Sequence, residues 1–223
     1  MELILQEENF LVKTLHTHEE AEEALRLRHD VFREELKWVP PSSDGLDLDE
    51  YDQYAQGIGV FEEKAGLLGH VRLINAPDPF MIEKDFAKLL PKDSSFKKSA
   101  GMAESTRICV KKEARTDTHL SMTLAHLLYK AMYHWSLSNG IKTLITIVEK
   151  RYYVLLKRSR FPFKQVGEFD MMGEGVLSGI ISLDWREFDE VISAKRPEFF
   201  EWFVRKPDLD PKRLLSHGLY LRR

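Results

Sequence analysis

The chain contains little cysteine, no long apolar run and no excess of basic charge. Cys109 is the one cysteine among 223 residues, so an internal disulfide and a cysteine-based metal cluster are both excluded. No apolar stretch approaches transmembrane length, and the acidic start lacks the basic and apolar regions of a signal peptide. The net charge of -3 gives no general attraction to nucleic acid or membranes. These absences predict a cytoplasmic protein without a metal site.

Local patterning predicts a chain of mixed strands and helices. Strands are expected at residues 10–15, 58–62, 67–74, 101–110, 141–148, 163–169 and 175–183. Helices are expected at residues 18–38, 77–91, 118–138, within 150–164, and at 185–204 with an interruption at Pro197. Hairpins joined to crossover helices indicate an α/β fold, a three-layer α-β-α sandwich around a mixed, mostly antiparallel sheet. We expect a main domain over residues 1–184 and a C-terminal helical extension over residues 185–223.

A polar run interrupts the strand expected at residues 101–110. Alternation along a strand places Glu104 and Thr106 on one face and Ser105 and Arg107 on the other. Only a bulge would direct Glu104 and Arg107 into one cleft. Buried polar groups must be paired, so the run is either a structural ion pair or the floor of an active site. These residues alone favour the structural pair.

The loop after Trp38 is acidic, with carboxylates at Asp44, Asp47, Asp49, Glu50 and Asp52. It is either a solvated mobile loop or a lid whose carboxylates meet a cationic ligand. Arg72, within an expected strand, needs a carboxylate partner if it faces inward, and this loop or Glu104 would supply one.

Nine residues follow one another in the order typical of a known enzyme family. They are Arg28, Phe32, Trp38, Asp49, Asp52, Arg72, Phe86, Glu104 and Arg107. On this pattern the chain resembles the acyl-homoserine-lactone synthases, the autoinducer synthases of the LuxI type. The element order also resembles the GNAT acyltransferases, but Thr118 and Leu120 stand where the GNAT coenzyme A loop has small residues.

The resemblance implies a two-step reaction that makes a quorum-sensing signal. An acyl group moves from acyl carrier protein, or from acyl-CoA, to the amine of S-adenosylmethionine. Closure of the lactone then releases methylthioadenosine, and no cofactor is bound permanently. Glu104 is the candidate general base, Ser105 a candidate oxyanion donor, and Arg107 or Arg28 a candidate clamp for the substrate carboxylate.

The resemblance also implies three binding regions. Residues 25–56 would form a mobile lid over S-adenosylmethionine, which would be bound by Arg28, Phe32, Trp38, Asp49, Asp52 and Arg72. The acyl pocket is expected around Phe86, Met102, Met122, Leu124 and Val148. Acyl carrier protein is acidic, and the docking site is expected at the basic residues Lys150, Arg151, Lys157, Arg158, Arg160 and Lys164.

Two other functions stay open at this point. One is a different GNAT-type N-acyltransferase that makes N-acyl amino acids or amines, and the other is a non-catalytic sensor of the same fold. The sequence decides neither the length and 3-position oxidation of the acyl chain nor the acyl donor. Val148 offers no hydroxyl for a 3-oxo group, which favours unsubstituted chains.

Overall fold

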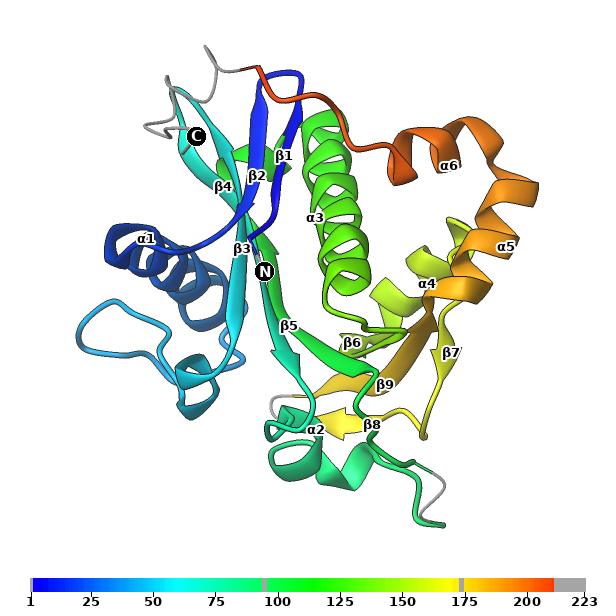
Figure 1. Cartoon of the computed structure of the whole chain (residues 1–223). Coiled ribbons are helices and arrows are strands. Elements are labelled where there is room, and N and C mark those ends of the chain that lie inside the picture. The colour runs from blue at the N-terminus through cyan, green and yellow to red at the C-terminus, as the bar shows by residue number, and fades with distance from the viewer. Residues whose placement is uncertain (1, 94–95, 173–174, 211–223) are drawn as a thin grey trace.

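The computed structural model describes residues 2–93, 96–172 and 175–210. The described part contains a nine-stranded sheet in the order β1-β2-β3-β4-β5-β6-β9-β7, with β8 pairing β9 (Figure 1). Among the strands of the described residues, only β5 and β6 pair in parallel. The strands are β1 Ile4–Glu7, β2 Phe10–Thr14, β3 Gln56–Glu62, β4 Gly66–Asn75, β5 Met102–Val110, β6 Thr143–Glu149, β7 Lys164–Gln165, β8 Asp170–Met172 and β9 Val176–Asp184.

Helices cover both faces of this sheet (Figure 1). One face carries α1 (His18–Arg28), the π-helix His29–Glu35 and α2 (Met81–Lys84), and the other carries α3 (Thr118–Ser138), α4 (Lys150–Arg158), α5 (Trp185–Lys195) and α6 (Pro197–Val204). Short 3-10 helices lie at Glu50–Gln53, Ala87–Leu89 and Glu113–Arg115. The predicted three-layer α/β sandwich with a mixed, mostly antiparallel sheet is confirmed.

The C-terminal helices share the main hydrophobic core. Trp185, Phe188, Ile192 and Phe203 are all buried against residues of α3. Lys130 of α3 is also buried and donates to the Trp202 carbonyl oxygen at 2.7 Å. Residues 185–204 therefore pack as part of the same body as the sheet, while residues 211–223 of the predicted extension lie outside the described residues.

Four local features differ from the sequence-based prediction. The strand expected at residues 163–169 shortens to β7, Lys164–Gln165. The first strand, Ile4–Glu7, was not expected, although it forms a hairpin with β2. The helix expected over residues 18–38 changes at His29 from an α-helix into a π-helix. The helix expected at residues 77–91 shortens to α2 and a 3-10 turn, since Glu83 caps α2 while Phe86 leaves the helical conformation.

Within the described residues, no helix is both long enough and apolar enough to cross a membrane.

Candidate active site

A cluster of ion pairs joins the acidic loop to the sheet beneath it. Its arginines come from α1, the π-helix, β4 and β5, and its three aspartates come from the loop. Its members are Arg28, Arg33, Arg72, Arg107, Asp47, Asp49 and Asp52. The carboxylates that were expected to form a lid are thus bound to arginines in this structure.

Asp47 lies at the centre of the cluster and is fully buried. Its Oδ2 accepts from Arg28 Nε at 3.1 Å and from Arg107 Nε at 2.7 Å, and its Oδ1 accepts from Arg33 Nε at 2.8 Å. Burial alone would raise the pKa of this carboxyl, but Arg107 and Arg28 hold the pKa below its ordinary value. Asp47 therefore stays ionised and anchors three guanidinium groups.

Asp49 and Asp52 lie nearer the solvent and bind the remaining guanidinium edges. Arg72 Nη1 donates to Asp49 Oδ1 at 2.5 Å and to Asp52 Oδ1 at 2.9 Å. Arg28 donates through both Nη atoms to Asp52, at 2.6 and 3.1 Å. The acidic loop supplies the partner that Arg72 was expected to need, and Thr106 Oγ1 accepts from its Nε at 2.9 Å.

A β-bulge brings Arg107 into this cluster. The register between β4 and β5 shifts by one residue, from Arg72 opposite Thr106 to His70 opposite Cys109. Arg107 has φ of +51°, a left-handed conformation that is rare for residues with a side chain. The bulge turns the Arg107 side chain to the face of β5 that carries Thr106 and Glu104. The sequence analysis required such a bulge for Glu104 and Arg107 to share one face.

Glu104 lies on the same face of β5 and is fully buried. Its carboxylate accepts from the backbone amides of Met81 at 2.6 Å and Ile82 at 3.0 Å, at the start of α2. Burial raises the pKa of Glu104 to about 7, and the two amides only partly oppose that effect. A carboxyl with a pKa near neutrality is suited to accept a proton in the neutral pH range.

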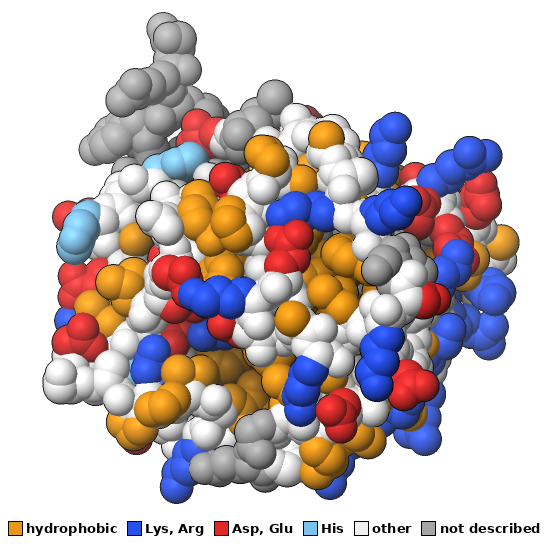
Figure 2. Space-filling model, turned by 90° about the horizontal axis from the view of Figure 1, so that it is seen from below, with side chains coloured by type: hydrophobic (Ala, Val, Ile, Leu, Met, Phe, Trp, Pro, Cys, Tyr) orange, Lys and Arg blue, Asp and Glu red, His pale blue; other side chains and the backbone are white. Residues whose placement is uncertain are grey.

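Two aromatic side chains border the cluster. The Phe32 and Trp38 rings lie with their centroids 6.1 Å apart, and the Arg107 guanidinium lies 5.4 Å from the Phe32 ring centroid. Trp38 is 47% exposed, so its indole face is available to a ligand. Figure 2 shows a face of the molecule that is hollowed near its centre, with hydrophobic side chains at the bottom of the hollow.

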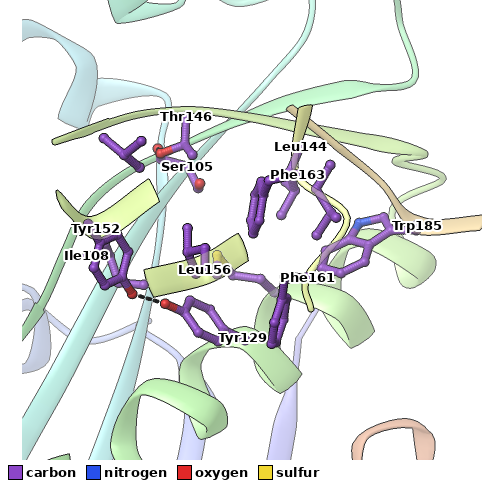
Figure 3. Close-up of a pocket in the computed structure, with 13 residues that line it drawn as sticks. Ser105, Ile108, Tyr129, Leu144, Thr146, Tyr152, Leu156, Phe161, Phe163 and Trp185 are labelled. Carbon is purple, nitrogen blue, oxygen red and sulfur yellow. Dashed lines mark hydrogen bonds between the residues drawn. The ribbon is translucent and has the colours of Figure 1, made fainter. Parts of the chain in front are cut away.

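A small apolar cavity lies on the opposite face of β5 (Figure 3). Pairing between β5 and β6 ends at Ser105 and Thr146, and the cavity continues between the two strands from there. It is lined by Ser105, Ile108, Tyr129, Met132, Leu144, Thr146, Val148, Tyr152, Leu156, Phe161, Phe163, Leu183 and Trp185. Its volume is about 30 Å³, enough for one or two water molecules.

The wall of the cavity combines two polar pairs with a large aromatic end. The Tyr129 and Tyr152 hydroxyls are hydrogen-bonded to each other between α3 and α4 (Figure 3). Thr146 Oγ1 donates to the Ser105 carbonyl oxygen at 2.8 Å. The cavity is narrow and its lining is mostly apolar, which suits an apolar chain better than a polar ligand.

Of the five residues predicted for the acyl pocket, only Val148 lines this cavity. Phe86 and Met102 pack on the other face of the sheet, in the cluster beneath α2. Leu124 is fully buried in the main core, and Met122 is 56% exposed. The structure does not bring these four residues together with Val148 at this cavity, because sequence spacing does not show where β5 and β6 diverge.

The basic residues predicted to bind a carrier protein lie on and beside α4. Figure 2 shows lysines and arginines gathered at the right of the molecule, on the side that carries α4 and β7 in Figure 1. Val154 and Leu155 of α4 are 40% and 55% exposed among them. Not all of the basic charge is free, since Lys164 pairs with Glu187 and Lys150 lies 4.0 Å from the Phe169 ring centroid.

A known family matches most of the chain, including the part that carries the charged cluster. The sequence model described as "Autoinducer synthase" matches residues 12–190. The chain belongs to the autoinducer synthase family. The fold and the family expected from the nine-residue pattern are thus confirmed, and this autoinducer synthase is an acyltransferase enzyme.

Relatives and solved structures agree with this assignment. The synthase is 29% identical over 170 residues to an acyl-homoserine-lactone synthase of Agrobacterium fabrum, covering 74% of this chain and 80% of the relative. It is 27% identical over 151 residues to the acyl-homoserine-lactone synthase of Aliivibrio fischeri, covering 67% of this chain and 78% of the relative.

Its fold is similar to that of BjaI, a CoA-dependent acyl-homoserine lactone synthase solved with MTA. The TM-score is 0.70 and the identity 18%, and the match covers 98% of this chain and 100% of BjaI. It is also similar to the AHL synthase LasI, with a TM-score of 0.66 and 19% identity over 78% of this chain and 89% of LasI.

Two residues of the site fall outside the nine-residue pattern. Asp47 was noted only as one of several loop acids, and Arg33 was not singled out. A possible signal for Asp47 was its place two residues before Asp49, which allows two carboxylates of an extended loop to share a side. Within the described residues, no group of three histidine, cysteine, aspartate or glutamate side chains could hold a metal ion.

Proposed function

We propose that this synthase transfers an acyl group from a thioester to the α-amine of S-adenosylmethionine and then closes the homoserine lactone. One observation carries the proposal: a charged cluster and an apolar cavity lie on opposite faces of the same stretch of β5, beside the point where β5 and β6 stop pairing. A polar, charged substrate fits the cluster, and an acyl chain fits the apolar cavity. The solved structure of BjaI with SAM and isopentyl-CoA supports this choice of substrates.

The charge of the cluster suits S-adenosylmethionine. S-adenosylmethionine carries a carboxylate and two cationic groups, and the cluster offers arginines for the first and aspartates for the others. The sulfonium would lie against the Trp38 face and near Asp49 and Asp52, where cation–π and Coulombic attraction act together. Both Nη atoms of Arg28 donate to Asp52, and Arg107 Nη2 donates to Asp49, so the substrate carboxylate would share or replace these aspartate contacts when it binds the two guanidinium groups.

Glu104 would take a proton from the ammonium group, directly or through a water molecule. The free amine then attacks the thioester carbonyl carbon, and the tetrahedral oxyanion is stabilised by backbone amides near the bulge and by Ser105. The carbon–sulfur bond breaks, and the thiolate leaves with a proton. In the second step a methionine carboxylate oxygen attacks the carbon attached to the sulfonium, which forms the lactone and releases methylthioadenosine.

We further propose acyl carrier protein as the donor, with acyl-CoA as the alternative. The exposed basic and apolar residues of α4 form a surface that complements an acidic helical protein. The inner side of α4 contributes Tyr152 and Leu156 to the cavity, so a carrier docked there would lie close to the acyl site. The single buried thiol of Cys109 is compatible with a cytoplasmic location.

The proposed reaction can be tested by mass spectrometry of organic extracts from a host that expresses this chain. Acyl-homoserine lactones are expected with the unmodified protein and not with Glu104→Ala. Their masses would also give the chain length and the 3-position oxidation. N-acylated amino acids without any lactone would overturn the proposal in favour of another N-acyltransferase, and no acylated product with either donor supplied in vitro would favour a sensor.

The docking surface has its own test. Charge reversal at Lys157, Arg158 and Arg160 should raise the KM for acyl carrier protein and leave S-adenosylmethionine binding unchanged. The unmodified enzyme should also bind the carrier more weakly as salt increases. Unchanged carrier kinetics in the triple variant would show that this surface does not bind the carrier.

A further inference from the structure

Arg33 occupies a central place in the charged cluster but is absent from the nine-residue pattern. We propose that Arg33 is a positioning residue for S-adenosylmethionine, acting through Asp47 and through the loop that carries Trp38. The proposal rests on the proposed function, because it assumes that S-adenosylmethionine binds at this cluster.

The π-helix gives Arg33 its direction. Leu36 N donates to the Val31 carbonyl oxygen at 2.9 Å, the five-residue spacing of a π-helix. In a regular α-helix, two residues five apart point about 140° away from each other. Here the wider turn lets Arg28 and Arg33 approach the same carboxylate, with Nε-to-Oδ distances of 3.1 and 2.8 Å to Asp47.

Arg33 holds the loop at two places. Its Nε donates to Asp47, and its Nη1 donates to the Pro40 carbonyl oxygen. Trp38 lies just before Pro40, and its backbone amide donates to the Phe32 carbonyl oxygen at 3.0 Å. Arg33 is 11% exposed, so it is packed beneath the loop and does not face solvent as a mobile cation.

Asp47 transmits the effect of Arg33 to the residues that would contact the substrate. Arg33 is the only arginine hydrogen-bonded to Oδ1 among the described residues, whereas Arg28 and Arg107 share Oδ2. Without Arg33, the Asp47 carboxylate loses the contact that fixes its rotation. Arg28 and Arg107 would then shift together, and small displacements of binding groups reduce the precision of substrate placement.

The test compares Arg33→Gln and Arg33→Lys with the control Arg26→Gln. Arg26 lies on the adjoining helix α1, is 59% exposed and pairs with the exposed Glu22, so it has the same charge as Arg33 but is paired away from Asp47 and Pro40. S-adenosylmethionine affinity is measured by titration calorimetry, the KM for the acyl donor by initial rates, and folding by the thermal midpoint.

We expect Arg33→Gln to weaken S-adenosylmethionine binding about tenfold, and Arg33→Lys about threefold because an ammonium cannot bind Asp47 and Pro40 in the same fork. The acyl-donor KM should stay within about twofold in both variants, and Arg26→Gln should bind like the unmodified protein. A double-mutant cycle with Asp47→Asn should show a smaller loss than the sum of the two single losses.

Two results would overturn the proposal. One is unchanged S-adenosylmethionine affinity in a folded Arg33→Gln variant, and the other is an equal rise in the constants for both substrates, which indicates a general structural role. If Arg33→Gln does not fold, the milder Arg33→Lys decides between these results. Failure of the unmodified protein to bind S-adenosylmethionine would refute the proposed function itself, so the two failures are distinguishable.

Discussion

Replacement of Glu104 by glutamine separates its catalytic role from its structural role. The carboxylate binds the amides of Met81 and Ile82, and burial raises its pKa from 4.5 to about 7. A general base must be deprotonated, so kcat of the unmodified enzyme should rise with pH and level off above about 7. Glu104→Gln cannot accept the proton and should lower kcat by about 10² to 10⁴.

Stability should change with pH in the opposite direction. An acid whose folded pKa is raised stabilises the fold fully below its unfolded pKa, and that contribution is lost as pH rises through the folded pKa. A rise from 4.5 to about 7 corresponds to about 3 kcal/mol of unfolding free energy lost between these two values. Activity and stability therefore have opposite slopes over the same pH range.

Other groups also change the free energy of unfolding between pH 4.5 and 7, so the effect of Glu104 must be isolated from theirs. Burial lowers the pKa of His70 to about 3 and that of His134 to about 4, and each therefore makes the fold less stable as pH falls. We therefore compare the unmodified enzyme with Glu104→Gln by urea unfolding at several pH values. The histidine contributions are the same in both proteins and cancel in the difference between their free energies of unfolding. Glutamine has one acceptor oxygen for two amides, which costs about 1–3 kcal/mol but does not change with pH.

The control is Glu83→Gln, which removes another carboxylate from the start of α2 while its side chain is 35% exposed. It should retain a kcat close to that of the unmodified enzyme, with the rise in kcat moved slightly to lower pH, because the Glu83 charge contributes to raising the pKa of Glu104. Near-full turnover of Glu104→Gln would show that Glu104 is not the base. If the difference in free energy of unfolding between the unmodified enzyme and Glu104→Gln does not vary between pH 4.5 and 8, the pKa of Glu104 is not raised.

Two further substitutions test the cluster and the cavity. Asp47→Ala should reduce the free energy of unfolding, measured by urea titration, by about 3–5 kcal/mol, because three arginines lose a buried counter-charge. The control Asp44→Ala, on the exposed loop, should change it by less than about 0.5 kcal/mol. Leu144→Ala should enlarge the cavity, shift the lactones detected by mass spectrometry towards longer chains, and cost about 2–5 kcal/mol of stability; Met122→Ala, at an exposed position, should leave the product distribution unchanged.

Much of the fold follows from local pattern. The 21-residue helix α3 begins at Asp117, whose carboxylate accepts from the amides of His119 and Leu120, and ends before Gly140, which has φ of +69°. Pro197 separates α5 from α6 as expected. Such signals lie within a few residues of the feature that they predict, and therefore need no knowledge of the rest of the chain.

The site depends on features that local pattern does not contain. The bulge at Arg107 results from the alignment of two strands that are about 30 residues apart in sequence. The sequence showed that a bulge was needed to place Glu104 and Arg107 together, but not that one was present. The π-helix is a second such feature, since nothing in its own residues favours five-residue spacing over four and the local pattern predicts an ordinary α-helix there.

The residues predicted for the acyl pocket lie mostly outside the cavity, for a reason that the strand geometry explains. Met102 and Ser105 lie on the same strand, but strand alternation places them on opposite faces, and only Ser105 reaches the cavity. Phe163 and Trp185 form the far end of the cavity, and Trp185 belongs to the predicted C-terminal extension. If an acyl chain fills this cavity, residues beyond the sheet limit its length. The C-terminal helices would then take part in substrate selection as well as in the core.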